Sequence, residues 1–212
     1  MNIKGEVEQM SKSKYVITVT RQFGSMGRPI AKRMAEKLDI SYYDRDLVDQ
    51  AAKKLNLPVS TVNEEEEYAQ KKIQNPFEAM RFPLGFKTSS TQDQIFEAQK
   101  NIIKFLAEKE TCVIVGRCSD FVLSDMDNAI HIYIYASYEA RLKHCIEDLH
   151  LSEPEARKMM ASVDEAREVY HLNYAGYKPD DKRFKDIMID SSMLGVEETA
   201  DYLIELIQRK FA

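Results

Sequence analysis

The sequence has few cysteines, no tryptophan and no long apolar run. Its three cysteines, Cys112, Cys118 and Cys145, form no Cys-x-x-Cys pair and are odd in number, which argues against a disulfide framework and against a zinc site. Cys112 and Cys118 flank an apolar segment, where a thiol packs as a small hydrophobic group. With 7 glycines and 6 prolines among 212 residues, the composition is that of a globular protein, and we expect disorder only at the ends.

An excess of basic residues is lacking as well. The net charge of −5 and the isoelectric point near 5.5 argue against a large nucleic-acid surface, because binding a phosphate backbone needs concentrated positive charge. A small phosphorylated ligand needs only a local basic pocket. No apolar run approaches a membrane span, and the first 14 residues are polar, unlike a signal peptide. We therefore expect a cytoplasmic protein without membrane contact, with a flexible tail over residues 1–14.

The most informative stretch covers residues 15–45. A β-branched run at residues 16–19 predicts a strand, and Gly24 and Gly27 bracket a tight loop. Apolar residues then recur at helical spacing, namely Ile30, Ala31, Met34, Ala35 and Leu38. Such a loop points backbone N–H groups at the start of the helix, where an anion such as phosphate is favoured. Two glycines alone also fit an ordinary turn between a strand and a helix.

Charged residues follow two further predicted strands. Asp44 and Arg45 come after a strand over residues 40–43, and Arg117 comes after a buried strand over residues 111–115. Ligands bind at the carboxyl ends of strands in open α/β sheets, and an arginine there can hold a phosphate through two hydrogen bonds. The alternatives are a helix-capping aspartate beside an exposed arginine, and for Arg117 a surface ion pair.

A predicted helix over residues 151–170 carries charge on one face. Arg157 and Asp164 lie about 20° apart around the helix axis, and Arg167 lies about 60° beyond Asp164. Two arginines and an aspartate therefore share a face. The alternative is a set of surface ion pairs that contribute only a few tenths of a kcal/mol each. A loop over residues 173–183 follows.

The order of the predicted elements indicates the fold class. Further strands are expected over residues 129–135 and 184–190, and further helices over residues 94–108 and 196–211. Alternating strands and helices predict a parallel sheet with helices on both faces, in one domain over residues 15–212. Between residues 56 and 87 the periodic signal weakens, which indicates an inserted subdomain. Its acidic run at residues 64–67 is typical of a solvated helix face.

The glycine loop resembles a known family. VITVTRQFGSMGRPIAKRMAEKLDISYYD, residues 16–44, aligns without a gap with the start of bacterial cytidylate kinases. It is more similar still to the cytidylate kinase-like family, whose loop typically reads RQ-aromatic-GSGGR. In this alignment Arg21 stands at the first glycine of the P-loop, Met26 at a later glycine, and Gly27 at the phosphate-binding lysine. Arg28 is the nearest cation that could replace that lysine.

Three later segments carry the same resemblance. Asp44 matches the aspartate of the family's Tyr-Asp-Arg segment, and Gly116-Arg117-Cys118 matches its Gly-Arg-Cys segment. Asp164 and Arg167, followed by Tyr170, match the Asp-x-x-Arg pattern of its lid. The resemblance implies an α/β, P-loop kinase-like three-layer fold with a five-stranded parallel sheet. It also implies an inserted helical subdomain over residues 56–92 on the acceptor side and a helical lid over residues 151–183.

The resemblance also implies a function. The chain would transfer the γ-phosphate of ATP to a nucleoside monophosphate or another small acceptor, with Mg²⁺ as the second cofactor and no protein ligand to a metal. The residues that would bind the nucleotide phosphates are Arg21, Gly24, Ser25, Met26, Gly27 and Arg28. Those that would bind the acceptor are Asp44, Arg45, Arg117 and Asp120. The catalytic residues would be Arg28, Arg157, Asp164 and Arg167.

Two other functions are left open by the sequence. Gly27 replaces the lysine, and Ile30 supplies no hydroxyl for Mg²⁺, so the chain can also be a non-catalytic nucleotide or anion binder with a degenerate P-loop. A third hypothesis is a structural or regulatory protein whose loop binds nothing. The expected ligands are a nucleotide and a small phosphorylated molecule, and a homo-oligomer is compatible with the sequence.

Overall fold

The computed structural model describes residues 14–44 and 89–211, which form one parallel sheet flanked by helices. The sheet has five strands in the order β2-β3-β1-β4-β5. Their bounds are β1 Val16–Arg21, β2 Ser41–Tyr43, β3 Cys112–Val115, β4 Ala129–Tyr135 and β5 Ile187–Asp190. Every neighbouring pair is parallel, which confirms the predicted five-stranded parallel sheet.

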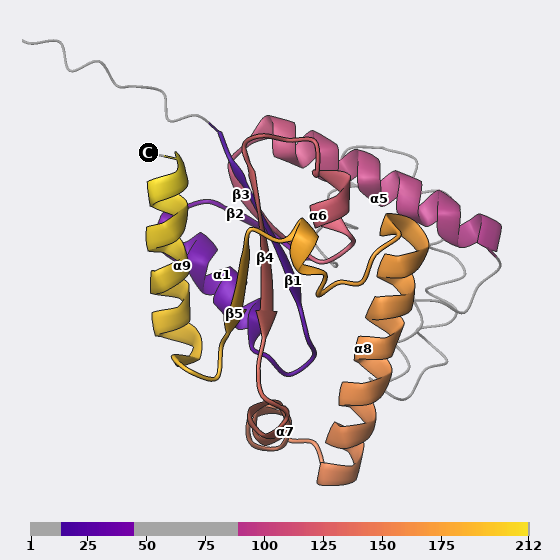
Figure 1. Cartoon of the computed structure of the whole chain (residues 1–212), viewed down its shortest axis with the longest axis vertical. Helices are drawn as coiled ribbons and strands as arrows, with labels where there is room; N and C mark the ends of the chain where they lie inside the picture. The colour runs from indigo at the N-terminus through magenta and orange to yellow at the C-terminus, as the bar shows by residue number, and fades with distance from the viewer. Residues whose placement is uncertain (1–13, 45–88, 212) are drawn as a thin grey trace, which may run out of the picture.

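Helices cover both faces of this sheet (Figure 1). The described helices are α1 Gly27–Leu38, α5 Ser89–Lys109, α6 Ser119–Val122, α7 Tyr138–Glu147, α8 Glu153–Ala175 and α9 Gly195–Phe211, with a 3₁₀ turn η2 at Lys182–Phe184. The helices α1 and α9 lie on one face, and α5, α6 and α8 lie on the other (Figure 1). The three-layer arrangement is therefore confirmed.

The core follows from the two-residue period of the strands. In β1, Ile17 and Val19 pack with Met34 of α1 and Leu203 of α9, while Val16 packs on the opposite face with residues of α5 and α6. Fully burying one such aliphatic side chain stabilises the fold by about 1.5–3 kcal/mol. Cys112, Cys118 and Cys145 are free and buried, as expected of cysteines that pack in a core.

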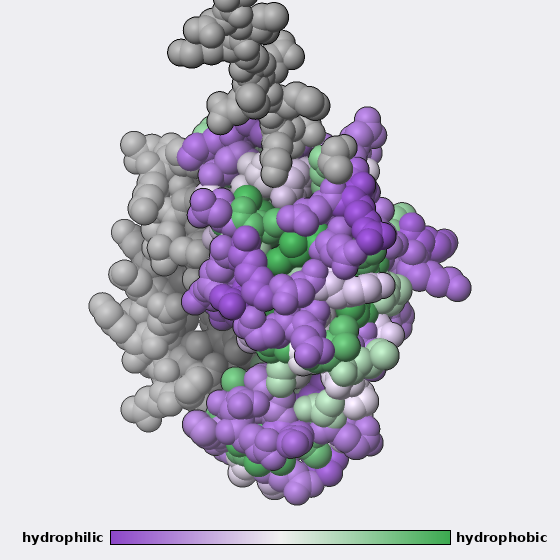
Figure 2. Space-filling view, turned by 90° about the vertical axis from the view of Figure 1, so that its left-hand side faces the viewer, coloured by the Kyte–Doolittle hydropathy of each residue, from purple (hydrophilic) through white to green (hydrophobic). Residues whose placement is uncertain are grey.

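The outer side of the α1–α9 layer is mainly hydrophilic. Figure 2 shows this side, which is on the left in Figure 1, with small hydrophobic areas between hydrophilic ones. Ion pairs join the two helices, from Arg33 to Glu197 and from Lys37 to Asp201. Among the described helices, none has the length and apolar character needed to cross a bilayer.

Several elements differ in length from their predicted ranges. The helix α8 continues to Ala175 and ends at Gly176, whose φ of 76° suits a left-handed cap. The strand β5 begins only at Ile187, and η2 takes in Phe184, the first residue of the predicted strand. The helix α5 begins at Ser89, within the range predicted for the insertion. Residues 1–13 of the expected N-terminal tail and most of the expected insertion lie outside the described residues, as does Arg45.

The strand register determines which loops meet. Arg21 at the end of β1 pairs with Ile134, Val19 pairs with Val115, and Tyr43 pairs with Ile114. The residues that follow β1, β2, β3 and β4 therefore share one edge of the sheet. The strand β1 lies between β3 and β4, so the strand order continues to opposite sides of β1. Open α/β sheets bind ligands at the carboxyl ends of the strands at such a switch point.

Candidate functional site

A short loop joins β1 to α1 at this edge. Gly24 has a φ of 77° and Met26 a φ of 56°, so the backbone turns twice through the left-handed region. Such alternation turns successive N–H groups to one side and forms a concave anion-binding nest. The first turn of α1 holds no acidic side chain that would occupy it. The loop and the N-terminus of α1 are therefore suited to hold a phosphate.

Packing within the protein holds this loop in place. The Ser25 hydroxyl is buried and donates to the backbone oxygens of Gln22 at 3.0 Å and Ile134 at 3.1 Å. The Ser191 hydroxyl donates to the backbone oxygen of Ser25 at 2.6 Å. A side chain on Gly24 would lie only 3.1 Å from the backbone oxygen of Arg141. The Ser25 hydroxyl is thus used to hold the backbone of the loop in its conformation.

Arg21 is the last residue of β1, and its side chain lies near two glycines, Gly27 and Gly116. A Cβ atom on Gly27 would lie 2.6 Å from the Arg21 Cβ, and one on Gly116 would lie 2.5 Å from the Arg21 Nη1. The side chain is therefore close to both the start of α1 and the loop after β3. Among the described residues, no carboxylate forms an ion pair with Arg21; Tyr42 is the neighbour that favours its charge.

Arg28 and Asp44 lie together. The Arg28 guanidinium forms an ion pair with the carboxylate of Asp44, and the Tyr42 hydroxyl lies 3.4 Å from the same carboxylate oxygen. Arg28 is 56% exposed, whereas the Asp44 side chain is 7% exposed. Arg28 was predicted to bind the nucleotide phosphates and Asp44 the acceptor, and the structure pairs the two. This pairing directs Arg28 toward the end of β2.

Arg117 is placed by a strained turn after β3. Gly116, Arg117 and Cys118 all have positive φ, at 79°, 57° and 51°, and consecutive left-handed residues other than glycine are uncommon. The Arg117 side chain is buried, 8% exposed, and interacts with the hydroxyl of Tyr170 on α8. Arg117 is therefore fixed at the edge of the sheet between β3 and α8.

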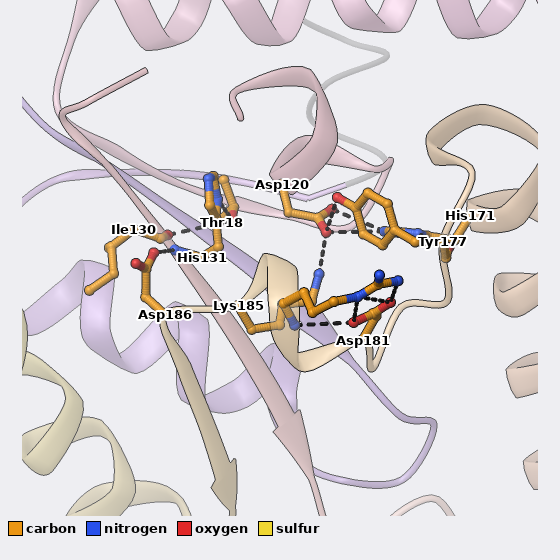
Figure 3. Close-up of polar contacts among 10 residues, drawn as sticks. Thr18, Asp120, Ile130, His131, His171, Tyr177, Asp181, Lys185 and Asp186 are labelled. Carbon is orange, nitrogen blue, oxygen red and sulfur yellow. Dashed lines mark hydrogen bonds and ion pairs between the residues drawn. The ribbon is translucent and has the colours of Figure 1, made fainter. Parts of the chain in front are cut away.

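Asp120 lies in the interior and not at the glycine loop. Its carboxylate, 1% exposed, accepts from the Tyr177 hydroxyl at 3.2 Å, from His171 Nε2 at 3.1 Å and from Lys185. Figure 3 shows these side chains pointing at one another from α6, α8 and the segments around η2. Burial raises the pKa of Asp120, but the hydrogen bond from His171 and the charge of Lys185 outweigh it and hold the pKa well below its usual range. These contacts join the end of α8 to the loop that carries Arg117.

The helix α8, which lies in the range predicted for a lid, contacts the loop through Asp164 and Arg167. Asp164 Oδ1 accepts from the backbone N–H of Phe23 at 2.7 Å, and Arg167 Nη1 donates to the backbone oxygen of Arg21 at 3.2 Å. Arg157 lies elsewhere, because it is exposed and binds Glu153 and the Tyr138 hydroxyl. The structure thus brings two of the three predicted lid residues to the loop.

Arg141 of α7 is a contact that sequence reasoning missed. It is 7% exposed, its Nε donates to the backbone oxygen of Phe23 at 2.6 Å, and its Nη2 pairs with Asp164. Arg141 and Asp164 therefore hold the Phe23 peptide from both sides. The available signal was its position in the first turns of a helix that starts at the carboxyl end of β4.

Positive charge accumulates at this edge. Burial lowers the pKa of Arg21, and the neighbouring charges of Arg167, Arg28 and Arg117 lower it further. Burial also lowers the pKa of Arg167. Asp44 pairs with Arg28 and Asp164 with Arg141, so among the described residues these two carboxylates do not balance five arginines. A site with this composition can bind an anion of high charge.

The fold is that of P-loop kinases, a three-layer arrangement around a five-stranded parallel sheet. The structure is similar to a shikimate kinase from Bacteroides thetaiotaomicron, with a TM-score of 0.53, 14% identity, and coverage of 92% of this chain and 99% of that chain. It is also similar to an uncharacterized protein from Eubacterium ventriosum, with a TM-score of 0.69, 29% identity, and coverage of 92% of this chain and 99% of that chain.

The chain belongs to the cytidylate kinase-like family, whose model matches residues 16–193. It is also 24% identical to a cytidylate kinase from Sulfolobus acidocaldarius over 188 residues, which are 88% of this chain and 91% of that protein. The family resemblance read from the glycine loop, the Gly-Arg-Cys segment and the lid is thereby confirmed.

Proposed function

We propose that this protein is a phosphotransferase that moves the γ-phosphate of ATP to a nucleoside monophosphate or another small acceptor. An oxygen of the acceptor would form a bond to the γ-phosphorus, and the bond to the β–γ bridging oxygen would break, so that ADP leaves. The observation that carries this proposal is the clustering of the charges of Arg28, Arg117 and Arg167 around Arg21, which forms no carboxylate ion pair among the described residues.

The donor phosphates would bind the glycine loop. The backbone N–H groups of residues 24–27 would form the cradle, and Arg21 and Arg167 would supply the charge. Asp164 and Arg141 would act as positioning residues, because they hold the Phe23 peptide. A preorganised set of donors stabilises the charge that develops on a transferring phosphoryl group without reorganising at the moment of reaction.

The acceptor would bind between the ends of β2 and β3. Arg117 would hold the acceptor's phosphate, and Arg28 and Asp44, which pair with one another, would lie beside it; Arg45 remains a candidate outside the described residues. The Sulfolobus acidocaldarius relative is a cytidylate kinase, which makes a nucleoside monophosphate the first acceptor to test. Asp120 would contribute by holding the Arg117 loop in place, and Arg157 would contribute only after leaving its contacts with Glu153 and Tyr138.

The proposed cofactors are ATP and Mg²⁺. Among residues 14–44 and 89–211, no group of three His, Cys, Asp or Glu side chains could hold a metal ion. Mg²⁺ usually keeps several waters and binds through nucleotide phosphates and one or two carboxylates, so it would enter with ATP. We derive no step through a metal bound by the protein.

A panel of transfer assays tests the proposal. Purified protein is incubated with ATP or GTP and with CMP, dCMP, UMP or AMP, and the formation of nucleoside diphosphates is measured. We expect transfer from ATP to at least one monophosphate, and no transfer to any acceptor would contradict the proposal.

A second candidate function is a non-catalytic nucleotide binder. Gly27 at the place of the P-loop lysine favours it. Nucleotides would then raise the melting temperature without any transfer, because a ligand that binds only the folded state stabilises it.

Substituting Arg117 tests the separation of the two subsites. We expect Arg117→Ala to weaken acceptor binding on the order of 10- to 100-fold, since charge-assisted hydrogen bonds to a phosphate are lost, and to change ATP affinity much less. The dissociation constants of both ligands are measured by calorimetry. Equal losses for the two ligands would show that Arg117 does not belong to the acceptor subsite.

A further inference from the structure

We infer that Arg21 supplies the phosphate-binding cation that P-loop enzymes take from a lysine, and that Gly27 is a glycine because it leaves room for the Arg21 side chain. This assignment rests on the proposed donor site at the glycine loop. The sequence had suggested Arg28 for this role because it is adjacent to the P-loop lysine position, whereas Arg21 lies at the end of β1.

The exchange between positions 21 and 27 is reciprocal. The P-loop pattern has a glycine at its start and a lysine six residues later, whereas this chain has Arg21 and Gly27 at those places. A Cβ atom at position 27 would lie 2.6 Å from the Arg21 Cβ and 3.0 Å from its Cγ. Any side chain at 27 thus conflicts with the one at 21. Gly27 has no positive φ, so the backbone itself does not require glycine there.

The Arg21 side chain then extends toward the loop after β3. A Cβ atom on Gly116 would lie 2.5 Å from Arg21 Nη1 and 3.6 Å from its Cζ, so the guanidinium lies against the bare backbone of Gly116. Arg21 belongs to the strand face that carries Ile17 and Val19, which is the face covered by α1. Its direction is therefore set by the strand and by two missing side chains.

The surroundings of Arg21 favour an anion. Its charged neighbours include Arg167, Arg28 and Arg117, and in the described part of the chain no carboxylate is paired with it. Arg28, by contrast, is paired with Asp44 and is more than half exposed. A guanidinium held among other cations gains most from a phosphate, which it can bind through two hydrogen bonds.

The test is a cycle of four proteins: the wild type, Arg21→Gly, Gly27→Lys, and the double variant Arg21→Gly/Gly27→Lys. Affinity for ATP and for pyrophosphate is measured by calorimetry, and transfer is measured in parallel. We expect each single variant to lose affinity on the order of 10- to 100-fold. The double variant places a lysine at the P-loop position and removes the clash, so it should regain most of the loss. The assignment would be overturned if the double variant lost as much affinity for ATP as the two single variants lose together.

Arg21→Met separates a binding role from a structural one. Methionine fills similar space without charge, so we expect a similar loss of ATP affinity together with an unchanged or higher melting temperature, because repulsion among the arginines is relieved. Arg28→Ala should weaken ATP binding less than Arg21→Met does. Unchanged ATP affinity in Arg21→Met, or a larger loss in Arg28→Ala, would contradict the inference.

The two proposals can fail separately. If the wild type transfers phosphate and Arg21→Met transfers it equally well, Arg21 is not the surrogate cation and the proposed function stands. If the wild type binds ATP through Arg21 but transfers nothing, the assignment of Arg21 stands and the proposed function fails. If the wild type binds neither ATP nor pyrophosphate, both are wrong.

Discussion

Replacing Lys185 with methionine should lower the free energy of unfolding by about 3–5 kcal/mol, because it leaves a buried carboxylate without its cation. The Lys185 and Asp120 side chains are 0% and 1% exposed. Water cannot reach Asp120 to replace the lost partner, and the carboxylate keeps only the hydrogen bonds that His171 and Tyr177 already make to it. Urea denaturation followed by circular dichroism measures the change.

Arg183→Ala is the matched control. Arg183 lies in η2 and also forms an ion pair, with Asp181, but its side chain is 73% exposed. Exposed pairs contribute at most about 1 kcal/mol, so the control should unfold almost like the wild type. Equal effects of the two substitutions would mean that the buried cluster in Figure 3 contributes no more than a surface pair.

The same cluster predicts how stability depends on pH. The pKa of Asp120 in the folded protein is lower than in the unfolded chain, where an aspartate titrates near pH ~3.9. Its contribution is therefore present above about pH 4 and is lost as pH falls toward the folded pKa. In Lys185→Met the pKa of Asp120 is depressed less, so the loss of stability on acidification should be shallower than in the wild type. Urea midpoints measured between about pH 2 and pH 5 decide this.

Replacing Arg167 with alanine should lower the kcat of the proposed phosphate transfer on the order of 10²- to 10³-fold, the loss typical of removing one charge-stabilising donor from a transition state. Arg167 reaches the loop from α8, with Nη1 3.2 Å from the backbone oxygen of Arg21 and 3.7 Å from Asp164 Oδ1. From there it can bind a phosphoryl group held by the loop. Arg167→Lys keeps the positive charge but loses the planar guanidinium, so its kcat should lie between those of the wild type and Arg167→Ala.

Arg33→Ala serves as the control for Arg167. Arg33 lies on the exposed side of α1, 39% exposed, and pairs with Glu197 and Glu36, so its loss should change kcat by less than about threefold. Steady-state rates at saturating ATP and acceptor are compared for both variants. An active Arg167→Ala enzyme with an unchanged kcat would exclude Arg167 from the transfer, and Arg157 would then be the lid arginine to substitute.

The arrangement of the backbone could be read from the sequence. Short β-branched runs and apolar residues at helical spacing predict the strands and helices. These signals are local, because each depends on residues within a few positions of one another. The segment at residues 129–135 was predicted with its observed bounds for this reason.

The partners of the charged side chains were decided by tertiary structure. Nothing near Asp120 in the sequence indicates that Lys185 and His171 will enclose it, and nothing near Arg28 indicates that Asp44 will pair with it. The sequence made Arg28 the substitute for the missing lysine because it is adjacent, whereas the fold places Arg21 between Gly27 and Gly116. A strand or helix can be predicted from local spacing, but the contacts of a long cationic side chain depend on which distant segments the sheet register brings to the same edge.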